Sequence, residues 1–95
     1  MAHSLSAKKR IRQNATRRAR NRARRTALKT RLRRCREQLL HGTVESAESA
    51  YRQVCQALDR AANRGTVHRN AAAHRKSRLA RRLNAMKQKQ TARDE

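Results

Sequence analysis

The chain has 95 residues and a formal net charge of +21, because 27 Lys and Arg stand against only 6 Asp and Glu. Half of its hydrophobic residues are alanines (17 in all), Tyr51 is the single aromatic residue, and there is no proline. This length and composition indicate one small domain with a thin core, which excludes a large enzyme with a deep pocket and suggests stabilisation by a polyanion.

Several classes of protein and site are excluded by the sequence. No stretch approaches the roughly 18 apolar residues that indicate a membrane span, and residues 1–7 lack the apolar core of a secretory signal. Cys35 and Cys55 form no CxxC pair, so we expect free thiols in a reducing cytoplasmic compartment and no metal site. With so few acids and no phosphate-binding glycine loop, we predict no catalytic residue and no cofactor.

Two glycines divide the sequence. Gly42 and Gly65 are the only strong helix breakers, and almost every other residue tolerates a helix. The polar C-terminal end is expected to fray. The prediction is a single domain over residues 1–95, with helices at about 7–41, 44–64 and 67–87 and a frayed tail at 88–95.

The first predicted helix, capped by Ser6 or Ser4, is the longest. At 1.5 Å per residue it extends about 50 Å, against about 30 Å for the second helix. About residues 7–22 should therefore overhang the rest of the domain, and this overhang lacks large apolar residues after Ile11. Apolar residues follow at helical steps of four, three and four, namely Leu28, Leu32, Cys35 and Leu39.

The second and third predicted helices show the same periodicity. Thr43 precedes the second and Thr66 precedes the third, so that each hydroxyl is placed to cap a helix N-terminus. The short connections favour antiparallel neighbours, which predicts an all-α, up-down-up three-helix bundle. The expected core stripes are Ala47, Tyr51, Val54, Leu58 and Ala61 in the second helix, and Ala72, Leu79, Leu83 and Met86 in the third.

Positive charge is concentrated in the first and third helices. Residues 1–36 hold 15 Lys and Arg and no acid, residues 37–63 hold two Arg against four acids, and residues 64–95 hold ten Lys and Arg against two acids. One interpretation is a solvated charged face. The other is that phosphates lie on more than one side of the first helix, because an acid-free helix repels itself without counter-charges. An arginine recurs every seven residues along one side of it, at Arg10, Arg17, Arg24 and Arg31.

Four short motifs follow one another along the chain. They are Ser6-Ala7-Lys8-Lys9-Arg10; Asn21 with Arg24-Arg25-Thr26 and Lys29-Thr30-x-Leu32-Arg33-Arg34; Asp59-Arg60-Ala61-Ala62-Asn63-Arg64-Gly65; and Gly65-x-x-His68-Arg69-Asn70-x-Ala72-Ala73-x-x-Lys76-x-x-Leu79. In this order and spacing they resemble the bacterial small-subunit ribosomal protein family S-twenty, over nearly the whole chain. The arginine-rich start and the two cysteines depart from the family pattern.

The resemblance implies a non-catalytic three-helix protein that binds 16S rRNA directly and acts early in assembly. It implies contacts with the 5′ domain and with the long helix near the 3′ end, next to other small-subunit components. The rRNA contacts that the matched motifs imply are Lys8, Lys9, Arg10, Asn21, Arg24, Arg25, Thr26, Lys29, Thr30, Arg33, His68, Arg69, Asn70 and Lys76.

Some of these residues have a second interpretation. His68 could pack beneath the turn or reach RNA, and the stem of Lys76 could pack while its ammonium reaches a phosphate. Thr26 and Thr30 could bind phosphate oxygens or bond back to helix carbonyls. The predicted contacts outside the motifs are Arg17, Arg18, His74, Arg75, Arg78 and Arg82.

Two other functions are compatible with the composition. Two absences argue against a DNA-compacting protein: there is no dimerisation stripe, and no apolar wedge residue lies in a basic arm. We also expect no homo-oligomer. A membrane-active cationic helix is opposed by residues 7–27, which offer only Ile11 and alanines as an apolar face. We therefore expect a structural rRNA-binding protein without a membrane partner.

Overall fold

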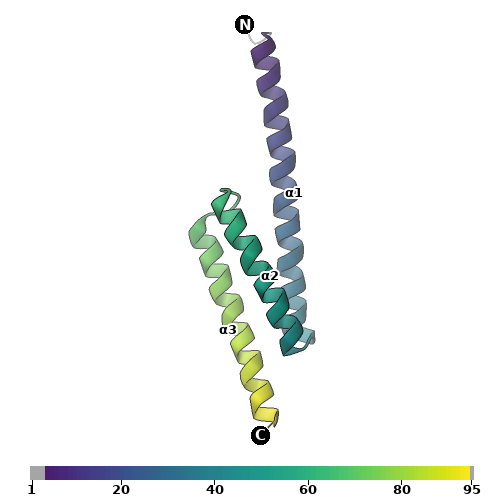
Figure 1. The fold of residues 1–95 in the computed structure, drawn as a ribbon, viewed down its shortest axis with the longest axis vertical. Coiled ribbons are helices and arrows are strands. Elements are labelled where there is room, and N and C mark those ends of the chain that lie inside the picture. The colour runs from purple at the N-terminus through teal and green to yellow at the C-terminus, as the bar shows by residue number, and fades with distance from the viewer. Residues whose placement is uncertain (1–3, 95) are drawn as a thin grey trace.

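The computed structural model describes residues 4–94, and this part of the chain is formed of helices without strands. This confirms the all-α prediction. Successive helices run in opposite directions, as Figure 1 shows. The helices are α1 (Leu5–His41), α2 (Val44–Asn63) and α3 (Arg69–Asp94).

The middle helix holds the other two together. Both α1 and α3 pack along α2, but they make few contacts with each other (Figure 1). The molecule measures 74 × 22 × 14 Å, so it is long and thin. This arrangement suits the charges, because the near-neutral α2 separates two strongly basic helices that would repel each other in direct contact.

The core is formed by the three predicted apolar stripes. Leu58, Val54 and Cys35 have the largest side chains among those that are completely enclosed. Leu39, Tyr51 and the end of the α3 stripe at Met86 are half-buried. Helical periodicity therefore identified the packed faces correctly. The buried core residues are Leu28, Leu32, Cys35, Ala47, Val54, Leu58, Ala61, Ala72, Leu79 and Leu83.

The first two helices begin at hydroxyl caps. At α1 the side chain of Ser4, rather than Ser6, accepts a hydrogen bond from the backbone N–H of Ala7 at 3.2 Å. At α2 Thr43 and Ser46 each accept from the backbone N–H of the other, which forms a capping box and confirms Thr43 as the cap. Both caps satisfy N–H groups that have no partner inside the helix.

The turn between α1 and α2 requires a residue without a side chain. A Cβ atom added to Gly42 would lie 2.7 Å from Ser46 Oγ and 2.9 Å from the carbonyl oxygen of Gln38. The Ser46 hydroxyl also donates to Gln38 Oε1 at 2.7 Å, which closes the turn. Gly42 is therefore needed for close approach.

Gly65 ends α2 for a different reason, because its φ of 75° lies in the left-handed region. The N–H of Gly65 donates to the carbonyl of Ala62 at 3.1 Å, and that of Thr66 donates to Ala61 at 2.9 Å. These two bonds form a Schellman motif, which satisfies carbonyls left free at the helix end.

Replacing Gly65 by alanine is expected to lower the free energy of unfolding by about 1 kcal/mol. The cost is conformational, since a Cβ at this position would meet nothing within 4 Å. Urea unfolding at fixed salt measures it, with Gly65→Asn as the matched variant, because asparagine tolerates the left-handed region better. Equal losses in both variants would contradict this explanation.

The third helix starts later than predicted, and Thr66 does not cap it. The helix begins at Arg69, and the Nδ1 atom of His68 accepts from the N–H of Asn70 at 3.1 Å, so His68 is the cap. Thr66 Oγ1 is instead buried without a partner in the described chain. The reason is the Schellman motif: the N–H groups of Thr66 and Val67 both point back to the carbonyl of Ala61.

The third helix also continues further than predicted. We expected residues 88–95 to fray, but α3 extends to Asp94, and residue 95 lies outside the described chain. This segment contains no glycine or proline and is rich in Lys, Gln and Ala, which are good helix formers. Its Thr91 hydroxyl bonds back to the Lys87 carbonyl at 3.0 Å.

The two cysteines are free, as predicted. Cys35 is buried and Cys55 half-buried, and burial raises the pKa of the Cys35 thiol. A hydrogen bond to Cys55, together with burial, raises the pKa of Tyr51 to about 12. The Tyr51 hydroxyl also reaches α3, where it lies 3.5 Å from the Lys76 carbonyl oxygen. These neutral groups belong to the packed part of the domain.

Candidate nucleic-acid interface

The overhang is the exposed segment of α1 at residues 8–27. Every one of these 20 residues is exposed, and Leu28 is the first buried residue of the helix. At 1.5 Å per residue the overhang is about 30 Å long. Figure 1 shows it extending beyond α2 and α3. It is longer than the predicted 7–22 and offers all its sides to a partner.

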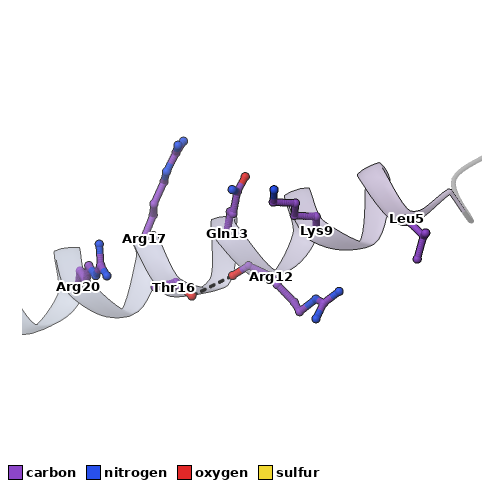
Figure 2. Close-up of a pocket in the computed structure, with 7 residues that line it drawn as sticks. All are labelled: Leu5, Lys9, Arg12, Gln13, Thr16, Arg17 and Arg20. Atoms are coloured by element: carbon purple, nitrogen blue, oxygen red, sulfur yellow. Dashed lines mark hydrogen bonds between the residues drawn. The ribbon is translucent and has the colours of Figure 1, made fainter.

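Cationic side chains leave the overhang in several directions. Figure 2 shows Lys9, Gln13 and Arg17 extending from one side of the helix and Arg12 from the opposite side. Together with their neighbours they line a shallow depression of about 660 Å³. Because no carboxylate precedes Glu37 in the sequence, the overhang can bind anions on more than one side without competition from its own chain.

Most predicted contacts on α1 are exposed. Thr30 is the exception: it is half-buried and its hydroxyl donates to the Thr26 carbonyl at 3.0 Å, so Thr30 bonds back to its own helix. The exposed predicted residues on α1 are Lys8, Lys9, Arg10, Arg17, Arg18, Asn21, Arg24, Arg25, Thr26, Lys29 and Arg33.

Two of the predicted contacts on or next to α3 already bond to other groups of the protein, and the others are exposed. His68 is exposed rather than packed beneath the turn, and its ring caps the helix. Lys76 is half-buried, with its Nζ 2.7 Å from Asp59 Oδ1. This bond raises the pKa of Lys76, so the ammonium is paired within the protein. The other exposed candidates are Arg69, Asn70, His74, Arg75, Arg78 and Arg82.

Two lysines of α3 thus pair with acids of α2. Besides the Lys76–Asp59 pair, Lys87 Nζ lies 3.0 Å from Glu48 Oε1. These pairs direct two of the three acids of α2 toward α3 and leave the arginines of α3 available. Partial exposure limits what such pairs contribute to stability.

The Lys87–Glu48 pair predicts a dependence of stability on pH. The hydrogen bond from Lys87 lowers the pKa of Glu48 below its ordinary value of 4.5. A lowered folded-state pKa contributes stability that is complete above the unfolded-state pKa and is lost as the pH falls through the folded-state value. Glu48→Gln should therefore lower Tm at neutral pH. It should also flatten the fall of Tm that the wild-type protein shows below pH 4.5.

Thermal unfolding followed by circular dichroism measures this effect. The matched control is Glu37→Gln, which removes an exposed acid of α1 and should keep the wild-type pH profile. Parallel profiles for wild type and Glu48→Gln would show that the pair contributes nothing.

Sequence reasoning left several exposed cations out of the site. The predicted contacts came mostly from the matched motifs, whereas almost all sides of the first helix are open. The density of the basic run was the signal for including them. On α1 and α3 the omitted exposed residues are Arg12, Arg20, Arg22, Arg31, Arg34, Arg36, Arg81, Lys89 and Arg93.

The exposed side chains of the described residues suit the binding of anions. Residues 4–94 contain no cluster of three or more His, Cys, Asp or Glu that could hold a metal ion. Within the same range no helix is both long and apolar enough to cross a bilayer. The arrangement is a set of exposed guanidinium and ammonium groups on two helices, held apart by α2.

Comparisons with known proteins identify relatives over nearly the whole chain. The family model described as Ribosomal protein S20 matches residues 2–84. The small ribosomal subunit protein bS20 of Thermobifida fusca is 46% identical over 92 residues, which cover 97% of this chain and all of that protein. Those of Shouchella clausii and Bifidobacterium longum subsp. infantis are 41% and 45% identical over 86 residues, or 90% of this chain and 98% and 100% of theirs.

Proposed function

Because the chain belongs to the ribosomal protein S20 family, we propose that it binds 16S rRNA directly and stabilises its fold during and after assembly. The family consists of cytoplasmic small-subunit ribosomal proteins and not of enzymes. The observation that carries the proposal is the overhang, in which 20 consecutive exposed residues include ten Lys and Arg and no acid.

The proposed mechanism is neutralisation of phosphates. A-form RNA hides the base edges of its deep major groove, so basic helices contact mainly the backbone and the 2′-hydroxyl groups. Arginine suits this role because its planar guanidinium forms paired hydrogen bonds with phosphate. The overhang would then lie between RNA segments whose phosphates otherwise repel each other.

The second basic surface is on α3, which is separated from α1 by α2. Its exposed arginines, such as Arg75, Arg78 and Arg82, allow a second RNA segment to bind away from the first. We propose that the two surfaces bridge the 5′ domain of 16S rRNA and the long helix near its 3′ end. This would join RNA segments that are distant in sequence.

Binding is expected to stabilise the overhang. Without RNA, amide protons of residues 8–25 should exchange much faster than those of the packed helices, because self-repulsion and the lack of tertiary contacts favour local opening. Bound 16S rRNA should protect them. Hydrogen exchange with mass spectrometry measures both states, and equal protection along α1 in the free protein would contradict coupled ordering.

Competition binding tests the proposed function. Labelled 16S rRNA bound to the full chain is challenged with unlabelled 16S rRNA or with duplex DNA of equal phosphate concentration, at physiological salt. We expect the rRNA to compete far better. A preference for duplex DNA would overturn the proposal in favour of a DNA-compacting role.

A further inference from the structure

A groove lies at the end of the molecule opposite the overhang. It has a volume of about 910 Å³ and lies between the α1–α2 turn and the last turns of α3. The groove exists because α3 continues past the core as a helix to Asp94. It is therefore separate from the exposed face of the overhang.

The floor of the groove is apolar. Leu40, at the end of α1, is 73% exposed, although large apolar residues are scarce in this chain. Leu39, Val44 and Met86 line the same groove and are half-buried. Leu40 is largely uncovered and the other three side chains are partly uncovered, so an external group with an apolar surface can rest on them.

Charges are distributed unevenly around this floor. Arg82, Lys89 and Arg93 line the α3 side, whereas Glu45 is the acid on the opposite side, at the start of α2. An occupant that complements this pattern has an anionic end toward α3, an apolar body, and hydrogen-bond donors toward Glu45. An unpaired nucleotide combines these features, with its phosphate, the faces of its base, and the amino and imino groups of the base edge.

We propose that the groove receives one unpaired guanosine of the rRNA that the chain binds. This inference rests on the proposed function and adds to it a site that recognises a base, whereas the overhang contacts the backbone. Guanine fits best, because its N1–H and N2–H₂ donors lie side by side and match the two oxygens of a carboxylate. An acidic protein segment would place a carboxylate near Glu45 as well as near α3, so the charges favour the nucleotide.

Photo-crosslinking locates the occupant. The full chain, with a diazirine-bearing leucine analogue at position 40, is reconstituted into small subunits with 16S rRNA and the other subunit proteins. Crosslinks are mapped by primer extension and mass spectrometry. The matched control carries the analogue at position 5, which is 83% exposed at the far end of α1. We expect position 40 to label one unpaired nucleotide that position 5 does not label.

Three results would overturn the inference: labelling of a protein segment, labelling of duplex RNA only, or no labelling from position 40 while position 5 crosslinks to rRNA. The proposed function would survive each of these if the chain still binds 16S rRNA. A chain that does not bind 16S rRNA would remove both proposals.

The role of Glu45 is tested with the mapped nucleotide. Changing that nucleotide to uridine should weaken binding of the wild-type chain about tenfold. Glu45→Gln should reduce this discrimination, while Glu37→Gln, which changes an exposed acid outside the groove, should retain it. Equal discrimination in all three proteins, or a mapped nucleotide that is already uridine, would contradict recognition by Glu45.

Discussion

The affinity of the full chain for 16S rRNA is expected to fall about 10³–10⁵-fold when monovalent salt is raised from 50 to 200 mM. This range corresponds to roughly six to ten phosphate contacts, each of which releases condensed counterions from the RNA. The ten cations of the overhang alone can supply that number. Filter binding over a series of salt concentrations measures the slope, and a loss of less than tenfold would contradict phosphate neutralisation as the main source of affinity.

Single substitutions distinguish specific contacts from general charge. Arg17→Gln, in the overhang, should reduce the salt slope by about one contact. Arg52→Gln is the matched control, because Arg52 is also exposed but lies on α2, 3.9 Å from Glu48. Identical slopes for the two variants would show that net charge, and not the position of the arginine, determines binding.

Replacing Leu58 by alanine is expected to lower the free energy of unfolding by about 2–5 kcal/mol. Leu58 is completely buried on α2, the helix that packs against both of the others. A small domain is stable by only about 5–15 kcal/mol, and a chain of this charge should lie near the lower limit. The substitution should therefore leave about 0–3 kcal/mol of stability in the isolated protein, which urea titration at fixed salt measures.

The control for Leu58 is Leu40, which has the same side chain in an exposed position. Leu40→Ala should change the free energy of unfolding by no more than about 0.5 kcal/mol. If the two variants were destabilised equally, the packed core would not be the source of stability.

Local sequence signals were sufficient to predict the helices and their packed faces. Leu28, Leu32 and Cys35 recur at helical spacing, and all three are buried. Gly42 and Gly65 mark the two turns, the first through close packing and the second through its positive φ. These features are local, since they depend on residues at most a few positions apart.

The candidate interface was predictable in outline but not residue by residue. A dense run of cations without acids is visible in the sequence. In the structure, nearly every residue that the motifs selected is exposed. The sequence left two partners open for Thr30, and the structure shows the bond to its own helix. The partner of Lys76, which is Asp59, was not predictable. The Lys76 pair joins residues 17 positions apart and depends on how α3 rests on α2.

Three helices, an apolar stripe on each helix and two basic segments separated by a near-neutral one follow from residue spacing, glycine positions and charge, because these signals act over short distances. Only the packing of α3 on α2 placed Lys87 beside Glu48, 39 positions earlier in the chain. It also brought Leu40 and Met86 to one groove. These features depend on how the helices pack, and packing joins residues that no local pattern connects.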